Sequence, residues 1–169
     1  MRELIIRKAI KDDAEKIIEY LNLIGGESEN LLFGENEFNM SIENERSFIE
    51  SMNNSDRNIL LVGLVNKEMV SIASLQGYER DRIAHRGNMG VSVKKKYWHK
   101  GIATKMINEL IKFAKSANIT VIELEVKSEN TNAIDLYEKI GFEKIGVYRN
   151  FVKINDKYYD NYLMNLYLD

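Results

Sequence analysis

The residues best suited to chemistry lie in the segment KKKYWHKGIATKM, which spans residues 94–106. Five of its thirteen residues are lysine, His99 lies among them, and no residue is acidic. After Gly101 the pattern becomes that of an amphipathic helix. A helix N-terminus presents unpaired backbone N–H groups and about half a positive charge, and a glycine there lets a large anion approach the backbone. The segment therefore predicts a phosphate or diphosphate site.

The cations around this segment have two interpretations. His99, Lys100 and Lys105 would add positive charge near the same anion, as would the lysines before them. Alternatively, the lysines at 94–96 are only the solvated end of a strand. The turn at Lys100 and Gly101 is the stronger candidate, because glycine and charge coincide there at the start of a helix.

Several other chemistries lack the residues that they need. The chain has no cysteine, which excludes disulfides, thiolate nucleophiles and cysteine-ligated zinc. Its two histidines, His85 and His99, fit no metal-ligand spacing. Neither the nucleotide-binding patterns G-x-x-x-x-G-K-[ST] and G-x-G-x-x-G nor the hydrolase pattern G-x-S-x-G occurs. A phosphate site alone does not name the molecule that carries the phosphate.

The composition is that of an ordinary globular domain. The 169 residues are 44% hydrophobic and 30% charged, with a net charge of −2. Nucleic-acid binding needs surplus lysine and arginine, so we expect no nucleic-acid partner. The longest apolar run, at 59–65, is far shorter than the roughly 20 residues that span a bilayer. With no visible signal peptide, we expect a cytoplasmic protein without a membrane anchor.

Hydrophobic periodicity gives the elements that position the basic segment. Asp12 is the expected N-cap of the first helix, Gly25 and Gly26 its end, and Ser41 the N-cap of the second. Residues 27–40 have no clear period and read as a loop or a broken helix. We expect helices over about 12–24, 41–52, 101–117 and 131–140, and strands over about 4–9, 59–65, 69–78, 84–94, 120–127, 142–154 and 158–168. This order predicts one α/β domain with a mixed sheet.

Two stretches share the motifs of a known family. The first, GNMGVSVKKKYWHKGIATKMINELIKFA, has a strand, a turn of the form Q/R-x-x-G-x-G/A and a helix, with Trp98 in the place of glutamine or arginine. The second, from Asn130 to Phe142, fits N-x-x-A-x-x-L-Y-E-K-x-G-F. Because both occur in order and correctly spaced within residues 87–142, the chain resembles the GNAT superfamily of N-acetyltransferases.

The resemblance implies one GNAT-like domain over residues 1–169, with a mixed, mostly antiparallel sheet whose central strands splay apart. It implies acetyl-CoA as the donor, with the pantetheine arm paired to the strand at Val91 and Val93, as an added strand would be. Asn130 would bind the same arm through its side chain, and Lys139 is either near the cofactor or simply solvated. The diphosphate would lie on Trp98, His99, Lys100, Gly101, Ile102, Ala103 and Thr104.

The implied chemistry is direct attack of an amine on the thioester. An alkyl amine, with a pKa of about 10.4, must lose a proton first, and a backbone N–H near Val91 would stabilise the oxyanion that follows. Tyr137 corresponds to the tyrosine thought to protonate the leaving thiolate; the alternative is a helix aromatic packed on the sheet. Glu125 is the expected base, with Glu123 on the same strand face and Glu79 as further options. A solvated strand face would explain these carboxylates equally.

The acceptor is expected to be a primary amine: a small amine, an amino acid, an antibiotic or a protein N-terminus. Its cleft would involve residues 25–40 and 149–162, including Phe33, Phe38, Tyr158 and Tyr159, although aromatic packing also explains these four. A non-catalytic acyl-CoA sensor and a phosphate-anchored interaction module are the alternative functions. Exposed edge strands permit either a monomer or a homodimer.

Overall fold

The computed structural model describes residues 3–169, which form a seven-stranded sheet and four α-helices. The order of the elements is the one expected from the sequence. The strands are β1 (Leu4–Lys8), β2 (Asn58–Val65), β3 (Glu68–Gly77), β4 (Arg86–Val93), β5 (Val121–Lys127), β6 (Glu143–Ile154) and β7 (Lys157–Tyr167). The helices are α1 (Ala14–Glu27), α2 (Ile42–Asn53), α3 (Ile102–Ser116) and α4 (Thr131–Ile140).

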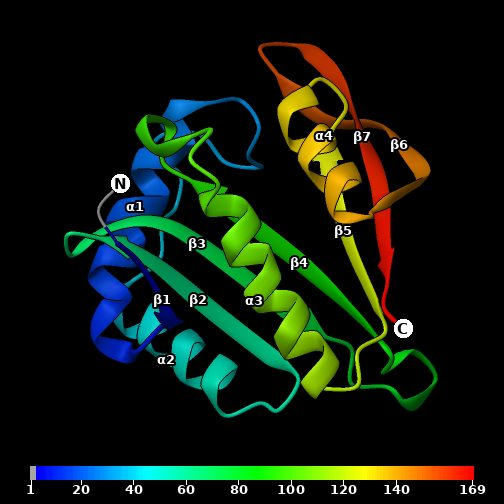
Figure 1. The fold of residues 1–169 in the computed structure, drawn as a ribbon. Coiled ribbons are helices and arrows are strands. Elements are labelled where there is room, and N and C mark those ends of the chain that lie inside the picture. Colours follow the sequence, from blue (N-terminus) through cyan, green and yellow to red (C-terminus); the bar gives the residue numbers. More distant parts are fainter. Residues whose placement is uncertain (1–2) are drawn as a thin grey trace.

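The sheet is mixed and splits in its middle. Its strand order is β1-β2-β3-β4-β5-β7-β6, and every neighbouring pair is antiparallel except β4 and β5. That parallel pair is short, because it joins only residues 86–88 to residues 121–123. Beyond this point the two strands diverge (Figure 1). The expected mixed sheet with splayed central strands is confirmed.

The N-terminal half of the sheet, β1–β4, is packed on both faces (Figure 1). Alternate residues of β2 enter different cores: Leu61 packs with α3, whereas Val62 packs with α1 and α2. This explains the continuous apolar run of β2, since a strand covered on both faces needs no polar side. From α3, Met106 and Leu110 are fully buried in the first of these cores.

The C-terminal half, β5–β7, has an apolar core on one face only. Ile122, Leu124 and Val126 pack under α4 and belong to the same core as α3. The core beneath α1 and α2 contains no residue of β5–β7 within the described part of the chain. The opposite face of β5 carries Glu123, Glu125 and Lys127, because side chains alternate along a strand.

Two expectations about the first helix are wrong. Asp12 is not its N-cap, because residues 11–13 form a 3-10 turn and α1 begins at Ala14. Asp13 is the residue that fastens this turn: its carboxylate accepts hydrogen bonds from the Ile10 N–H at 2.9 Å and from both Arg7 guanidinium nitrogens at 2.6 and 2.8 Å.

The glycine pair does not end α1, which continues to Glu27. A Cβ atom on Gly25 would lie 2.2 Å from the carbonyl oxygen of Gly34. Glycine is therefore needed here so that the following loop, residues 28–41, can pack against the helix.

Other local expectations are confirmed. Ser41 caps α2 by accepting the Asn44 N–H at 3.2 Å, and Gly141, with φ of 113°, ends α4. β4 begins at Arg86, two residues later than expected, because residues 81–83 form a 3-10 turn. Within residues 3–169, none of the helices combines the length and the apolar character needed to cross a bilayer.

Candidate active site

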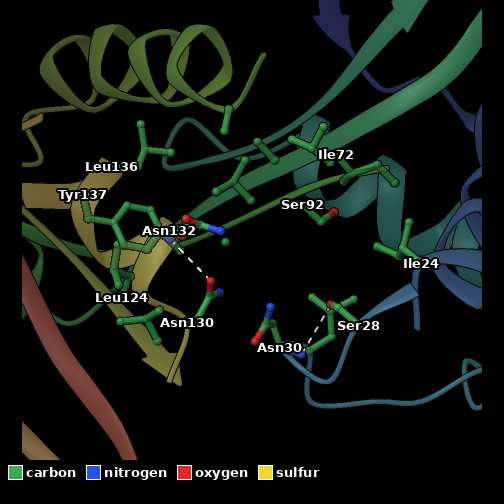
Figure 2. Close-up of a pocket in the computed structure, with 18 of the residues that line it drawn as sticks. Ile24, Ser28, Asn30, Ile72, Ser92, Leu124, Asn130, Asn132, Leu136 and Tyr137 are labelled. Carbon is green, nitrogen blue, oxygen red and sulfur yellow. Dashed lines mark hydrogen bonds between the residues drawn. The ribbon is translucent and has the colours of Figure 1, made fainter. Parts of the chain in front are cut away.

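A cleft of about 900 Å³ opens where β4 and β5 separate. It is lined from both halves of the sheet. Figure 2 shows Ile24, Ser28 and Asn30 on one side, facing Asn130 and Tyr137 on the other. The separation of β4 and β5 thus creates a cleft, and residues that are far apart in the sequence line it.

The edge of β4 in this cleft carries free backbone groups. Lys94 donates its N–H to Val70, and Tyr78 donates its N–H to Arg86, so the even-numbered residues of β4 are the ones that bond to β3. Val91 and Val93 therefore direct their backbone groups toward the gap, beyond the last residue paired with β5. The Val93 carbonyl accepts a hydrogen bond from Trp98, so the Val93 N–H and both backbone groups of Val91 are the ones left for a ligand. An extended molecule could add to this edge as a strand does.

The turn before α3 exposes a second set of backbone donors. Gly101 has a left-handed φ of 74° and leaves open space where a Cβ would lie. The first hydrogen bond within α3 runs from the Lys105 N–H to the Gly101 carbonyl at 3.2 Å, and no side chain caps the helix. The N–H groups of residues 102–104 thus have no partner in the part of the chain that the structure describes. Unpartnered N–H groups of this kind, at the start of a helix that borders a cleft, suit an anion.

Trp98 holds this turn against β4. Its indole N–H donates to the carbonyl of Val93 at 2.7 Å. His99, the next residue, adopts a left-handed φ of 59° and is exposed at the rim of the cleft. The residue that departs from the family pattern therefore has a structural task, which is to connect the turn to the strand before it.

Most of the nearby lysine charge is directed away from the anion site. The carboxylate of Glu68 binds the ammonium of Lys96 at 2.8 Å and that of Lys94 at 3.1 Å, and the hydrogen bond from Lys96 is the main reason that the pKa of Glu68 falls to about 2. Lys105 lines a separate groove beside Ile6. Lys105 therefore does not line the cleft, and the donors that the cleft offers at the start of α3 are mainly backbone N–H groups.

Tyr137 comes from α4 and reaches the cleft from a buried position. Its side chain is 8% exposed, and its ring lies 5.6 Å from that of Phe142. Burial raises the pKa of Tyr137 to about 12. Its hydroxyl forms no hydrogen bond to another described residue, so a ligand can accept one from it.

Asn130 is the N-cap residue of α4, and it lines the cleft. Its side-chain oxygen accepts the Ala133 N–H at 3.4 Å (Figure 2), which leaves its amide N–H₂ group for a ligand. Asn132 also lines the cleft. Sequence reasoning missed Asn132, because it occupies a variable position of the motif.

The three candidate carboxylates are placed very differently. Glu125 is exposed and lines the cleft. Glu123 accepts hydrogen bonds from Tyr78 and from Arg86, whose Nε lies 3.2 Å away, so it has a structural role. Glu79 does not line the cleft. Glu125 is the carboxylate that the structure brings to the site.

Of the four aromatic residues that the sequence suggested for the acceptor cleft, only one lines the cleft. Phe33 lines the cleft, but Phe38 packs beside it with ring centres 6.0 Å apart, and neither Tyr158 nor Tyr159 lines it. In their place, Lys127 of β5 and Asn161 of β7 reach the cleft. The alternation Glu-x-Glu-x-Lys in β5 was the available signal for Lys127, because it puts all three side chains on one face.

Comparison with known proteins identifies the family. Residues 6–163 match the family described as acetyltransferase (GNAT) domain. The chain belongs to the GNAT acetyltransferase family. A crystal structure of a GNAT-family acetyltransferase from Streptococcus pneumoniae superposes with a TM-score of 0.94 and 27% identity, covering 98% of this chain and 100% of that one. The expected GNAT-like fold is confirmed.

Two characterised relatives are similar over shorter stretches. The L-amino acid N-acetyltransferase AaaT of Escherichia coli is 29% identical over 105 residues, which is 62% of this chain and 65% of AaaT. The [ribosomal protein bS18]-alanine N-acetyltransferase of Haemophilus ducreyi is 35% identical over 69 residues, or 40% of this chain and 48% of that protein. These matches thus span less than two thirds of either relative.

The cofactor of the GNAT acetyltransferases is acetyl-CoA, and the structure of YncA from Salmonella typhimurium contains it. YncA superposes with a TM-score of 0.85 and 22% identity, covering 98% of this chain and 94% of YncA. The residues of the present cleft fit this cofactor: uncapped N–H groups at Gly101 suit a diphosphate, and the free edge of β4 suits an amide-containing arm.

Proposed function

We propose that this protein is an N-acetyltransferase that transfers the acetyl group of acetyl-CoA to a primary amine, acting as a single domain. The observation that carries the proposal is the continuity of two unpaired backbone surfaces. The first surface is the edge of β4, with the backbone groups of Val91 and the N–H of Val93, and it leads to the second, the N–H groups at residues 102–104. One long ligand with amide groups and a diphosphate would satisfy both.

Binding of the donor would use backbone groups first and side chains second. The N–H groups at the start of α3 would hold the diphosphate, with Trp98, His99 and Lys100 around it. Asn130 would donate its free amide group to the pantetheine arm. Acetyl-CoA supplies an acetyl group that is activated as a thioester, and the protein positions it.

Loss of a proton from the acceptor is the first chemical requirement. An ammonium group has no lone pair, so a base must take a proton before the nitrogen can attack. We assign this role to Glu125, which is exposed to the cleft on the open face of β5. Water can relay the proton, since the carboxylate lies at the solvent-accessible side of the passage.

Two donors would stabilise the negative charge that develops during transfer. The Val91 N–H points into the gap, where it can donate to the thioester oxygen. The hydroxyl of Tyr137 would donate to the departing sulfur. Since its pKa is about 12 and a thiol has a pKa near 8.5, the phenol stays protonated while the thiolate forms. Tyr137 therefore acts as a hydrogen-bond donor throughout the step.

The names of two relatives support a primary amine as the acceptor. AaaT is an L-amino acid N-acetyltransferase, and the Haemophilus relative acts on the alanine of ribosomal protein bS18. Small amines, amino acids and protein N-termini all present the primary amine that the chemistry requires.

A thiol-release assay with acetyl-CoA and a panel of amines tests the proposal. We expect release of CoA that depends on the acceptor, together with acetyl-CoA binding by calorimetry. Binding without turnover of any amine would instead indicate a non-catalytic acyl-CoA sensor. Absence of CoA binding would overturn both interpretations and favour a protein-interaction module.

A further inference from the structure

An apolar wall lines the side of the cleft that is nearest to α1. Its members come from α1, from the loop at residues 28–41 and from β3, and they are Leu21, Ile24, Leu31, Phe33 and Ile72. All five belong to the core under α1 and α2 or pack against it. Figure 2 shows Ile24 and Ile72 across the cleft from Tyr137. Leu21, Leu31 and Phe33 are only half-buried, so an apolar ligand that covers this wall removes further apolar surface from water.

The apolar wall and the open face of β5 lie on the same side of the sheet. Ile72 is paired with Ser92 in the register of β3 with β4, and Asn88 is paired with Glu123 in the register of β4 with β5. Because side chains alternate along a strand, Asn88 shares a face with Ser92. Glu125 shares a face with Glu123 for the same reason, and therefore with Ile72. A ligand on this side of the cleft can thus contact Ile72 and Glu125 together.

The open face of β5 and β7 offers oxygen atoms to such a ligand. Glu125 is an exposed carboxylate that lines the cleft. Asn161 also lines it; the residue is 4% exposed, and its side-chain oxygen has no hydrogen-bond partner among the described residues. Because Leu163 is paired with Glu125, Asn161 is a diagonal neighbour of Glu125, with Cα atoms about 7–8 Å apart. Two oxygen atoms at this spacing can accept hydrogen bonds from one ammonium group, which has three N–H donors.

Lys127, on the same strand face as Glu125, does not make this part of the cleft attractive to an anion. Its ammonium lies 3.7 Å from the carboxylate of Glu29 and 4.0 Å from that of Glu129. The ring centre of Tyr159 is 3.7 Å away. Two carboxylates and an aromatic ring thus already balance the charge of Lys127. A further carboxylate on this face would meet the like charge of Glu125.

We propose that the cleft selects an amphipathic primary amine as the acceptor, with an alkyl or aryl group and without a carboxylate. The inference rests on the proposed acetyltransferase function and names the acceptor class of that site. The ammonium group lies between Glu125 and Asn161, and the apolar group covers the apolar wall. Glu125 is then within reach of the proton that the nitrogen must lose. The oxygen of Asn161 holds the nitrogen in place and takes no proton.

A series of unbranched primary amines, from ethylamine to hexylamine, measures the contribution of the apolar wall. We expect kcat/KM at saturating acetyl-CoA to rise about threefold to fourfold with each buried methylene. Leu21→Asn should flatten this rise, because it makes the wall polar at similar side-chain volume. Leu23→Asn is the matched control, since Leu23 is also on α1 but is 48% exposed and does not line the cleft. If thermal unfolding shows that Leu21→Asn does not fold, Leu31→Asn makes the same change outside the helix. A wild-type rate that is independent of chain length would overturn the proposal.

Pairs of acceptors that differ only in a carboxylate test the polar part of the selection. Phenethylamine is compared with phenylalanine, 3-methylbutylamine with leucine, and tyramine with tyrosine. We expect kcat/KM to favour the amine of each pair by about tenfold or more, because the amino acid would bring an unpaired carboxylate close to the oxygen atoms of Glu125 and Asn161. Preference for the amino acid in these pairs would contradict the proposal.

Asn161→Leu removes the unpartnered oxygen with little change in side-chain volume. The KM for hexylamine should rise about tenfold, as for the loss of a charge-assisted hydrogen bond, while the dependence on chain length stays. Asn165→Leu is the control. Asn165 is also on β7 and 4% exposed, and its side-chain oxygen has no partner in the described chain either, but it does not line the cleft. A purely structural role for Asn161 predicts that both variants change the unfolding temperature and neither changes KM; that result would remove Asn161 from the site.

Direct binding separates this inference from the proposed enzyme activity. Calorimetry with the CoA-saturated protein measures the binding of hexylamine without turnover. If no amine is acetylated, but hexylamine binds to the wild-type protein about tenfold more tightly than to Asn161→Leu, the selection stands and the catalytic proposal fails. If amines are acetylated regardless of chain length or carboxylate, the catalytic proposal stands and the selection is wrong.

Discussion

The two halves of the sheet differ in how many of their faces carry an apolar core. Strands β1–β4 are covered on both faces, and each face has its own buried core. Strands β5–β7 are covered by α4 on one face, while the other face presents Glu125, Lys127 and Asn161 to the cleft. The first half supplies the strand edge that would hold the donor, and the second adds polar side chains to the lining of the cleft.

The boundary between the halves matters as much as either of them. Pairing of β4 with β5 stops after three residue pairs. A continuous sheet would satisfy the backbone groups of Val91 and Val93 internally, and no ligand could then use them. Packing on both faces holds β4 in place although part of its edge is not paired with a neighbouring strand. Such an unpaired edge offers backbone groups to a ligand.

The largest effect is expected in the packed half. Leu110→Ala should lower the free energy of unfolding by about 3–4 kcal/mol, because Leu110 is fully buried in the core under α3. Ile145→Ala on β6 is the matched change in the open half. Ile145 is 51% exposed, so its loss should cost only about 0.5 kcal/mol. Urea unfolding of both variants measures this contrast, and equal losses would mean that the halves are not packed differently.

The next largest effect is expected at the hydroxyl of Tyr137, which lies on α4 and lines the cleft between β4 and β5. Tyr137→Phe should lower kcat about a hundredfold while changing the KM for acetyl-CoA little, as expected for a donor used during transfer. Tyr97→Phe is the control, because Tyr97 also lines the cleft but donates its hydroxyl to Glu68 at 2.9 Å. Steady-state kinetics with both variants tests the assignment. A wild-type kcat in Tyr137→Phe would remove the hydroxyl from the mechanism.

A smaller effect is expected at the turn that follows β4. Gly101→Val should weaken CoA binding tenfold to a hundredfold, because valine disfavours the left-handed conformation of this residue and its side chain would occupy the space left for the diphosphate. Calorimetry with CoA measures the loss. Gly34→Val, at a loop glycine without a positive φ, should bind CoA normally. Unchanged affinity in Gly101→Val would show that the turn does not hold the cofactor.

The smallest effect is a pH-dependent one in the packed half. Burial would raise the pKa of Asp13, but the hydrogen bonds from Arg7 and from the Ile10 N–H hold that pKa below its ordinary value of 3.8. Its contribution to stability is thus complete above pH 3.8 and is lost as the pH falls through the lowered pKa. Asp13→Asn should cost about 1 kcal/mol at neutral pH, because Arg7 is partly exposed. Urea unfolding at several pH values should show this cost shrinking in acid; a constant cost would exclude the ion pair as its cause.

Local sequence signals predicted the order and the approximate bounds of the helices and strands well. The helical period after Gly101, the cap at Ser41 and the stop at Gly141 each depend on neighbours within a few residues. Where a distant contact decides, the same signals were wrong. Gly25 is a glycine because the loop at Gly34 packs against it, and α1 continues past it.

Candidate residues divide in the same way. Glu123 and Glu125 are equivalent in the sequence, but Arg86 and Tyr78 bind the first and leave the second at the cleft. Lys105 belongs to the basic segment, yet its place on α3 directs it to another groove. These outcomes depend on which strand or helix lies opposite each residue in the folded protein. A single sequence does not show such tertiary contacts directly.

The sequence by itself determined the order of helices and strands, the motifs of a GNAT acetyltransferase and the glycine turn, because these depend on short-range periodicity and backbone conformation. Tertiary structure alone decided which polar side chains meet on the open face of β5. Lys127 and Asn161 are 34 positions apart in the sequence and become neighbours only because β5 pairs with β7. Their burial arises from the packing of residues that are distant in the sequence, which local propensity does not encode.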